Sequence, residues 1–192
     1  MADATPPLGR RVIVNADDFG QSAGINDGII RCHEAGIVTS ASLMVCWPQA
    51  DAAAAYAQLR PALSVGLHVD LGEWVLRDGE WMPLYTVVAT WEETTIRFEI
   101  LRQLEAFRRL LGRDPSHLDS HQHVHECEPV RGIVVEIGDR LGIPCRRCSQ
   151  DIRYCGEFYG QTRRGEASPD AIGVDRLVEI LRALPDGTTE LG

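Results

Sequence analysis

RVIVNADDFG, at residues 11–20, is the stretch that decides the fold. Its β-branched residues predict a strand at Arg11–Ala16. A helical pattern follows at Ser22–Ala35, and Ser22 is a favourable N-cap residue for it. A strand that leads directly into a helix is the first unit of an alternating α/β chain.

The same alternation continues along the whole sequence. Apolar patterns predict further strands at Ile37–Val45, Ser64–Asp70, His117–His123, Pro144–Arg147 and Thr188–Leu191. Helical spacing predicts helices at Gln49–Leu59, Glu92–Leu111, Pro129–Leu141 and from Ser168 to Leu184. Strands that alternate with helices indicate a parallel sheet or a (β/α) barrel, whose active sites gather at the carboxyl ends of the strands.

The chain has 192 residues, enough for one domain, and we expect residues 1–10 to form a flexible tail before it. Residues 72–91 lack clear periodicity and hold three of the four tryptophans. They predict a long loop with a hairpin turn at Asp78-Gly79, and loops of this length are often functional.

Composition excludes several classes of protein. The formal net charge is −9 and the sequence pI about 5.1, with no large basic cluster, which argues against a nucleic-acid partner. No long apolar run predicts a membrane span, and the first residues lack a secretory pattern, so we expect a cytoplasmic protein. Cys145 and Cys148 have the spacing of half a zinc site or a redox pair, but free thiols are the commoner interpretation.

Two predicted strands end in residues that carry chemistry. Asp17 and Asp18 follow the first strand, and adjacent carboxylates at a buried strand end call for a cation between them. The alternative is a solvated turn in which Asp18 caps the helix. His68 ends the third strand in GLHVDL, and a single histidine there is most often an ordinary core residue.

The stretch HLDSHQHVH, at residues 117–125, favours a metal-binding role for His68 over that of an ordinary core residue. Four of the six histidines fall within these nine positions, and packing alone gives no reason for a row of imidazoles. Strand periodicity would put four polar side chains on one face: Asp119, His121, His123 and His125. Two histidines and a carboxylate form a common catalytic metal set, and Asp17 is then available as the general base toward a water molecule. Imidazole ligands suit Zn²⁺, Fe²⁺ or Ni²⁺ better than Mg²⁺.

NADDFG, GLHVDL and HLDSHQHVH, in this order, resemble the motifs of the YdjC-like carbohydrate deacetylases. That family includes the chitooligosaccharide deacetylases, and its superfamily includes deacetylase-like proteins associated with hopanoid biosynthesis. The resemblance covers the chain from about Arg11 onward. It implies a distorted (β/α) TIM-like barrel that uses a metal ion to remove acetyl groups from N-acetylglucosamine-type sugars.

The resemblance also implies roles for individual residues. It implies one divalent metal ion, often described as Mg²⁺, with the ligands Asp18, His68 and His121. Asp17 matches the catalytic base of the family. His123 and His125 lie within the motif, and we expect them to contact substrate or to support the metal ligands.

In the family a Cys-His-Pro motif follows a strand like TTELG, and its histidine is thought to be the general acid. The sequence stops at Gly192, before that motif. We therefore expect a barrel that is incomplete at the C-terminus, impaired catalysis, and an open sheet edge that favours self-association into a homo-oligomer.

Three functions follow as hypotheses. The leading one is hydrolysis of the amide bond of an acetylated sugar, with Trp74, Trp81 or Trp91 stacking on sugar rings unless they serve only packing. The alternative is a metal- and sugar-binding pseudoenzyme or assembly subunit without the general acid. A phosphoesterase on the same scaffold ranks last, because no glycine-rich phosphate loop is evident.

Overall fold

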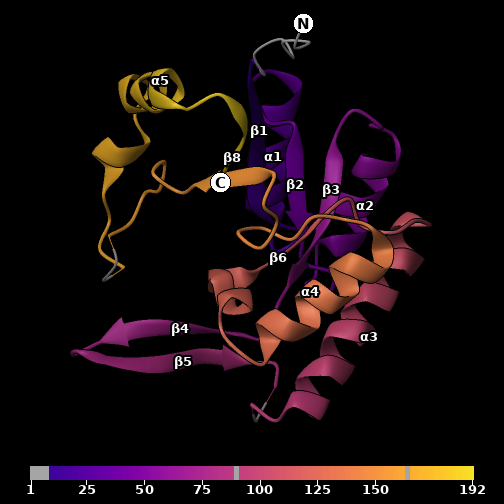
Figure 1. Cartoon of the computed structure of the whole chain (residues 1–192). Coiled ribbons are helices and arrows are strands. Elements are labelled where there is room, and N and C mark those ends of the chain that lie inside the picture. Colours follow the sequence, from indigo (N-terminus) through magenta and orange to yellow (C-terminus); the bar gives the residue numbers. More distant parts are fainter. Residues whose placement is uncertain (1–8, 89–90, 163–164) are drawn as a thin grey trace, which may run out of the picture.

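The structure, a computed structural model, describes residues 9–88, 91–162 and 165–192. Its centre is a six-stranded parallel sheet that curves as a half barrel, in the order β6-β3-β2-β1-β8-β7 (Figure 1). The strands are β1 (Arg10–Phe19), β2 (Ser40–Leu43), β3 (Ser64–Val69), β6 (Leu118–Ser120), β7 (Ile152–Cys155) and β8 (Gly187–Leu191). The predicted α/β fold of the distorted (β/α) barrel type is confirmed.

Five α-helices, two 3₁₀ turns and a separate hairpin complete the described fold. The helices are α1 (Ala23–Glu34), α2 (Ala50–Gln58), α3 (Glu93–Leu111), α4 (Val130–Leu141) and α5 (Val174–Ala183). The 3₁₀ turns are η1 (His121–Glu126) and η2 (Pro169–Ile172), and the antiparallel hairpin joins β4 (Gly72–Arg77) to β5 (Glu80–Thr86). Within the described ranges no helix is both long and apolar enough to cross a membrane.

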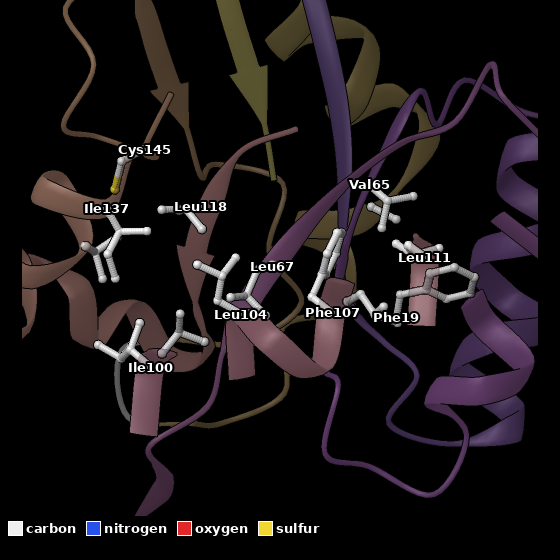
Figure 2. Close-up of a cluster of buried hydrophobic side chains, with 14 of the residues drawn as sticks. Phe19, Val65, Leu67, Ile100, Leu104, Phe107, Leu111, Leu118, Ile137 and Cys145 are labelled. Carbon is white, nitrogen blue, oxygen red and sulfur yellow. The ribbon is translucent and has the colours of Figure 1, made fainter. Parts of the chain in front are cut away.

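The outer face of the sheet carries the main hydrophobic core. Val65 and Leu67 of β3 point toward α3, whose buried side chains include Leu104 and Phe107 (Figure 2). Leu118 of β6 joins the same cluster. Complete burial of one such side chain stabilises a fold by about 1.5–3 kcal/mol, so this layer anchors β3, which carries His68, and β6, which leads into His121.

The inner face of the half barrel is polar instead. Because strand side chains alternate between faces, the residues between the core positions of β3 are Gly66 and His68. The neighbouring strands contribute other buried polar side chains to the inner face, among them Asn15, Ser42, Asp119 and Glu190. A polar interior that opens at the carboxyl ends of the strands is where a site is expected.

The expected helix starts and stops are partly confirmed. The Ser22 hydroxyl accepts a hydrogen bond from the Ile25 amide and caps α1, and Gly112 ends α3 in the left-handed conformation. The helix expected from Ser168 is interrupted: η2 ends at Ile172, and Gly173 lies between it and α5. Of the expected N-terminal tail, residues 1–8 lie outside the described residues, while Arg10 begins β1.

Two predictions about the later strands were wrong, and one strand was missed. The strand predicted at His117–His123 ends at Ser120, and the histidines that follow lie on the turn η1. Pro144–Arg147 forms no strand and makes only one isolated bridge, between Cys145 and Leu118. Strand β7 was missed, because IRYC is short and follows directly on an irregular stretch.

The long loop predicted at residues 72–91 is mostly the β4–β5 hairpin, and its turn lies at Asp78-Gly79 as expected. The hairpin extends away from α3 and α4 (Figure 1). Both turn residues have positive φ, +52° at Asp78 and +84° at Gly79, as a tight hairpin requires.

Gly66 of the GLH motif is required by close packing, and its replacement gives a direct test of the inner face. A Cβ atom at Gly66 would lie 2.3 Å from Nε2 of His117, a ring held by the hydroxyls of Ser42 and Ser116. We expect Gly66→Ala to lower the free energy of unfolding by about 1–3 kcal/mol, as overpacking does. Urea denaturation measures it, and Gly28→Ala, which meets nothing within 4 Å in α1, is the matched control. Equal stability of the two variants would contradict the packing.

Candidate functional site

The carboxyl ends of β1 and β3 and the turn after β6 bring three predicted metal ligands together. Oδ1 of Asp18 lies 3.3 Å from Nε2 of His68 and 3.0 Å from Nδ1 of His121. All three side chains offer a donor atom within 4.8 Å of the others. Residues 18, 68 and 121, far apart in sequence, therefore form one cluster.

A break in strand β1 separates the two aspartates. Asp18 has a φ of +64°, and the pairing with β2 shifts register between Ala16 and Phe19. Such a bulge turns the following side chain to a new direction. Asp17 consequently faces the inside of the half barrel, where it meets Arg146, while Asp18 faces the two histidines. The cap of α1 is Ser22, so Asp18 is not needed there.

Charge around the cluster favours a cation. Burial alone raises the pKa of Asp18, but hydrogen bonds to His121 and His68 outweigh it and hold the pKa well below its ordinary value. Burial likewise lowers the pKa of His68, yet the carboxylate of Asp119, 2.7 Å from its Nδ1, raises it to about 10. The carboxylates of Asp18 and Asp119 thus stabilise positive charge on or near the His68 ring.

The donor set fits a divalent metal ion. Two imidazole nitrogens, Nε2 of His68 and Nδ1 of His121, converge on one carboxylate oxygen of Asp18. Two histidines and one carboxylate with room for further ligands are typical of catalytic metal sites. Nε2 of His121 is also buried without a hydrogen-bond partner, although Oε2 of Glu73 lies 3.5 Å away.

Arg146 is the residue at this site that the sequence did not single out. Its side chain is fully buried, and its guanidinium bonds both carboxylate oxygens of Asp17, at 2.8 and 2.7 Å. It also lies 2.8 Å from Asp119 and 2.7 Å from Glu190. One cation therefore joins carboxylates from β1, β6 and β8.

No local pattern distinguishes Arg146 from its neighbour Arg147. Both belong to CRRC, which stood out in the sequence for its two cysteines; these and the other four cysteines are free thiols in the structure. Arg147 is exposed and pairs with Glu126. Arg147 has a φ of +58°, and its side chain stays at the surface while that of Arg146 is buried.

Asp17, predicted as the base, is held in one orientation. Besides Arg146, the amide Nδ2 of Asn15 donates to its Oδ1 at 2.8 Å. Its Oδ2 receives a bond from Arg146 alone, so one lone pair on this oxygen stays available. Asp17 also belongs to a second cluster of donor atoms, with His68 and Asp119, and so stands beside the first.

The turn η1 separates histidines that strand periodicity had placed on one face. Gln122 and His123 both have left-handed backbones, with φ of +51° and +54°, so the alternation ends at Ser120. His125 is fully buried, and its ring nitrogens meet the Ser120 hydroxyl at 2.6 Å and the Arg146 carbonyl at 3.2 Å. This placement favours a supporting role for His125 over contact with a substrate.

His123 lies on the other side of the turn, with its ring edge-on to Tyr154 at 5.5 Å between centroids. Nδ1 of His123 is buried without a hydrogen-bond partner. Burial and then the charge of Arg146 lower the pKa of His123 to about 4, so the ring is neutral near pH 7. His123 is therefore a neutral ring whose Nδ1 is unpaired but shielded from solvent.

Trp74 borders the site through the hairpin. The side chain of Gln122 bonds both the amide and the carbonyl of Trp74, at 2.9 and 2.8 Å. The Trp74 ring lies beside that of Trp91, with centroids 6.1 Å apart, and Trp91 is 49% exposed. An aromatic surface therefore adjoins the turn that carries His121.

A cavity of about 270 Å³ inside the half barrel lies apart from the candidate metal ligands. Asn15, Arg146 and Glu190 contribute to its wall, together with residues at the amino ends of β2 and β3, but none of Asp18, His68 and His121 does. The chemistry of the three ligands therefore belongs to the opposite, carboxyl end of the strands.

Comparisons with known proteins agree with this geometry. The chain is 34% identical to a carbohydrate deacetylase of Geobacillus stearothermophilus, over 94% of this chain and 76% of that protein. It is 35% identical to a chitooligosaccharide deacetylase of Salmonella paratyphi C, over 83% of this chain and 79% of that protein.

Two solved structures share the fold. A proposed cellobiose-phosphate cleavage protein from Enterococcus faecalis V583 superposes with a TM-score of 0.74 at 22% identity, covering 95% of this chain and 80% of that one. A mutant of a CE4-family pseudoenzyme with restored enzymatic activity superposes with a TM-score of 0.55 at 12% identity, covering 96% and 57%. Residues 11–191 match the sequence family described as YdjC-like protein, and the chain belongs to that family.

Proposed function

We propose that this protein is a metal-dependent deacetylase that hydrolyses the acetamido group of N-acetylated sugars such as chito-oligosaccharides. The observation that carries the proposal is the convergence of Asp18, His68 and His121 beside a carboxylate, Asp17, held by a buried arginine. The names of the Geobacillus and Salmonella relatives support the reaction and the substrate class. Cytoplasmic location and self-association remain predictions.

The metal ligands in this proposal are Asp18, His68 and His121. A divalent cation held there would polarise the acetyl carbonyl and make an attacking water more acidic. The two imidazoles favour Zn²⁺ or another transition metal, whereas the family resemblance favours Mg²⁺. Metal analysis of the purified protein decides between them.

Asp17 is the general base in this proposal. The bidentate contact with Arg146 orients its carboxylate, and the free lone pair of Oδ2 accepts the proton of the attacking water. His123 and Trp74 are proposed to contact the sugar, Trp74 through its ring face. His125 stabilises the turn η1 through its ring contacts with the Ser120 hydroxyl and the Arg146 carbonyl.

Acetate release from N-acetylated chito-oligosaccharides tests the proposal. We expect acetate to form with metal-loaded protein, to stop after EDTA treatment and to return when metal is added. Asp17→Asn is expected to lower kcat by about 10²–10⁴-fold, the usual contribution of a general base, while metal still binds. Absence of acetate with fully loaded, folded protein would reject the function, and binding of the sugar without turnover would favour a pseudoenzyme.

Metal binding should also release protons. Asp119 raises the pKa of His68 to about 10 against the effect of burial, so near pH 7 the ring carries a second proton, on Nε2, that a cation must displace. Affinity is therefore expected to increase as the pH rises toward 10. Calorimetric titrations in two buffers of different ionisation enthalpy measure the released protons, and equal apparent enthalpies in both buffers would contradict this assignment.

A further inference from the structure

Glu73 lies at the start of the hairpin and faces the predicted metal ligand His121. Its side chain is 24% exposed, and Oε2 lies 3.5 Å from Nε2 of His121. The other ring nitrogen of His121, Nδ1, is 3.0 Å from Oδ1 of Asp18. The imidazole thus stands between two carboxylates, one on the ligand side and one behind it.

The second histidine of the cluster has the same arrangement. Nε2 of His68 faces Asp18 at 3.3 Å, and Nδ1 is held from behind by Asp119 at 2.7 Å. A carboxylate behind a ligating histidine selects its tautomer, orients its ring and makes it a stronger ligand. The contact to Glu73 is longer than that to Asp119 and makes no hydrogen bond as it stands, so a small rotation of either side chain has to close it.

Two features of the backbone bring Glu73 to this position. The ladder between β4 and β5 shifts register between Glu73 and Trp74, a bulge that changes the direction of a side chain. Gln122, next to His121, bonds both backbone groups of Trp74, at 2.9 and 2.8 Å. The hairpin and the turn η1 are therefore joined at the residues adjacent to the pair Glu73 and His121.

We propose that Glu73 is a positioning residue for the metal site, which accepts a hydrogen bond from Nε2–H of His121 and leaves Nδ1 to bind the cation. The inference rests on the metal site of the proposed function and assigns to the hairpin a part in it. Glu73 acts through His121 and touches neither the cation nor the sugar. The effect of its loss should therefore depend on whether the imidazole is present.

Titration of the metal-free protein with Co²⁺, followed by visible absorption, tests this role. Glu73→Leu removes the acceptor and is expected to weaken Co²⁺ binding by about 10–100-fold, as for other residues behind metal ligands. Glu73→Gln keeps an oxygen that accepts from Nε2–H and should restore part of the affinity. Glu80→Leu, a change of the same kind on exposed β5, is the control and should bind Co²⁺ like the wild type.

A His121→Ala background shows whether Glu73 acts through the imidazole. Adding Glu73→Leu there should cause no further loss, and a further loss would overturn the proposal, because Glu73 would then act on the cation directly. Equal affinities of Glu73→Gln and Glu73→Leu would overturn it as well, since a hydrogen bond would not be involved. Failure of the wild type to bind Co²⁺, Zn²⁺ or Mg²⁺ would instead count against the proposed function itself.

Discussion

The guanidinium of Arg146 is the interaction on which the inside of this half barrel depends. It is fully buried and contacts Asp17, Asp119 and Glu190, which come from three different strands. Three carboxylates this close together in a buried place would repel one another strongly without a cation between them. Burial raises the pKa of Glu190, while the charge of Arg146 acts in the opposite direction.

The arrangement of the proposed metal ligands depends on the same charges. Asp119 binds Nδ1 of His68, and Arg146 binds Asp119. Arg146 therefore fixes the orientation of His68, a predicted metal ligand, through Asp119. Asp17 is bound by that arginine on one side and stands beside His68 on the other. The proposed base Asp17 and the proposed ligand His68 are therefore both oriented through Arg146, as a reaction needs when a water must be held near both.

Much of the fold and the cluster could be predicted, since both rest on local patterns. β-branched runs between helical patterns indicated the parallel strands, and strand ends with Asp18, His68 and His121 indicated where to look. The prediction that His123 and His125 share a strand face was wrong. The strand ends at Ser120, because Gln122 and His123 adopt left-handed backbones, and nothing in the residues HQHV predicts this turn.

Arg146 and Glu73 could not be predicted from sequence for a different reason. Each becomes informative only through partners far away along the chain: 129 residues separate Arg146 from Asp17, and Glu73 lies in a stretch without periodicity. CRRC offers two arginines with no local difference, yet one is buried and the other exposed. Contacts of this kind depend on how the strands are ordered in the sheet, which strand and helix patterns leave open.

The most direct measurement of the central claim is kcat for acetate release by Arg146→Lys at saturating metal. Lysine keeps the positive charge but cannot form the bidentate contact that orients Asp17. With the folded state confirmed by circular dichroism and the metal content by analysis, kcat should fall by about 10²-fold, as expected when a catalytic group is misplaced. A folded, metal-loaded Arg146→Lys variant with the kcat of the wild type would contradict the claim that this arginine supports the site.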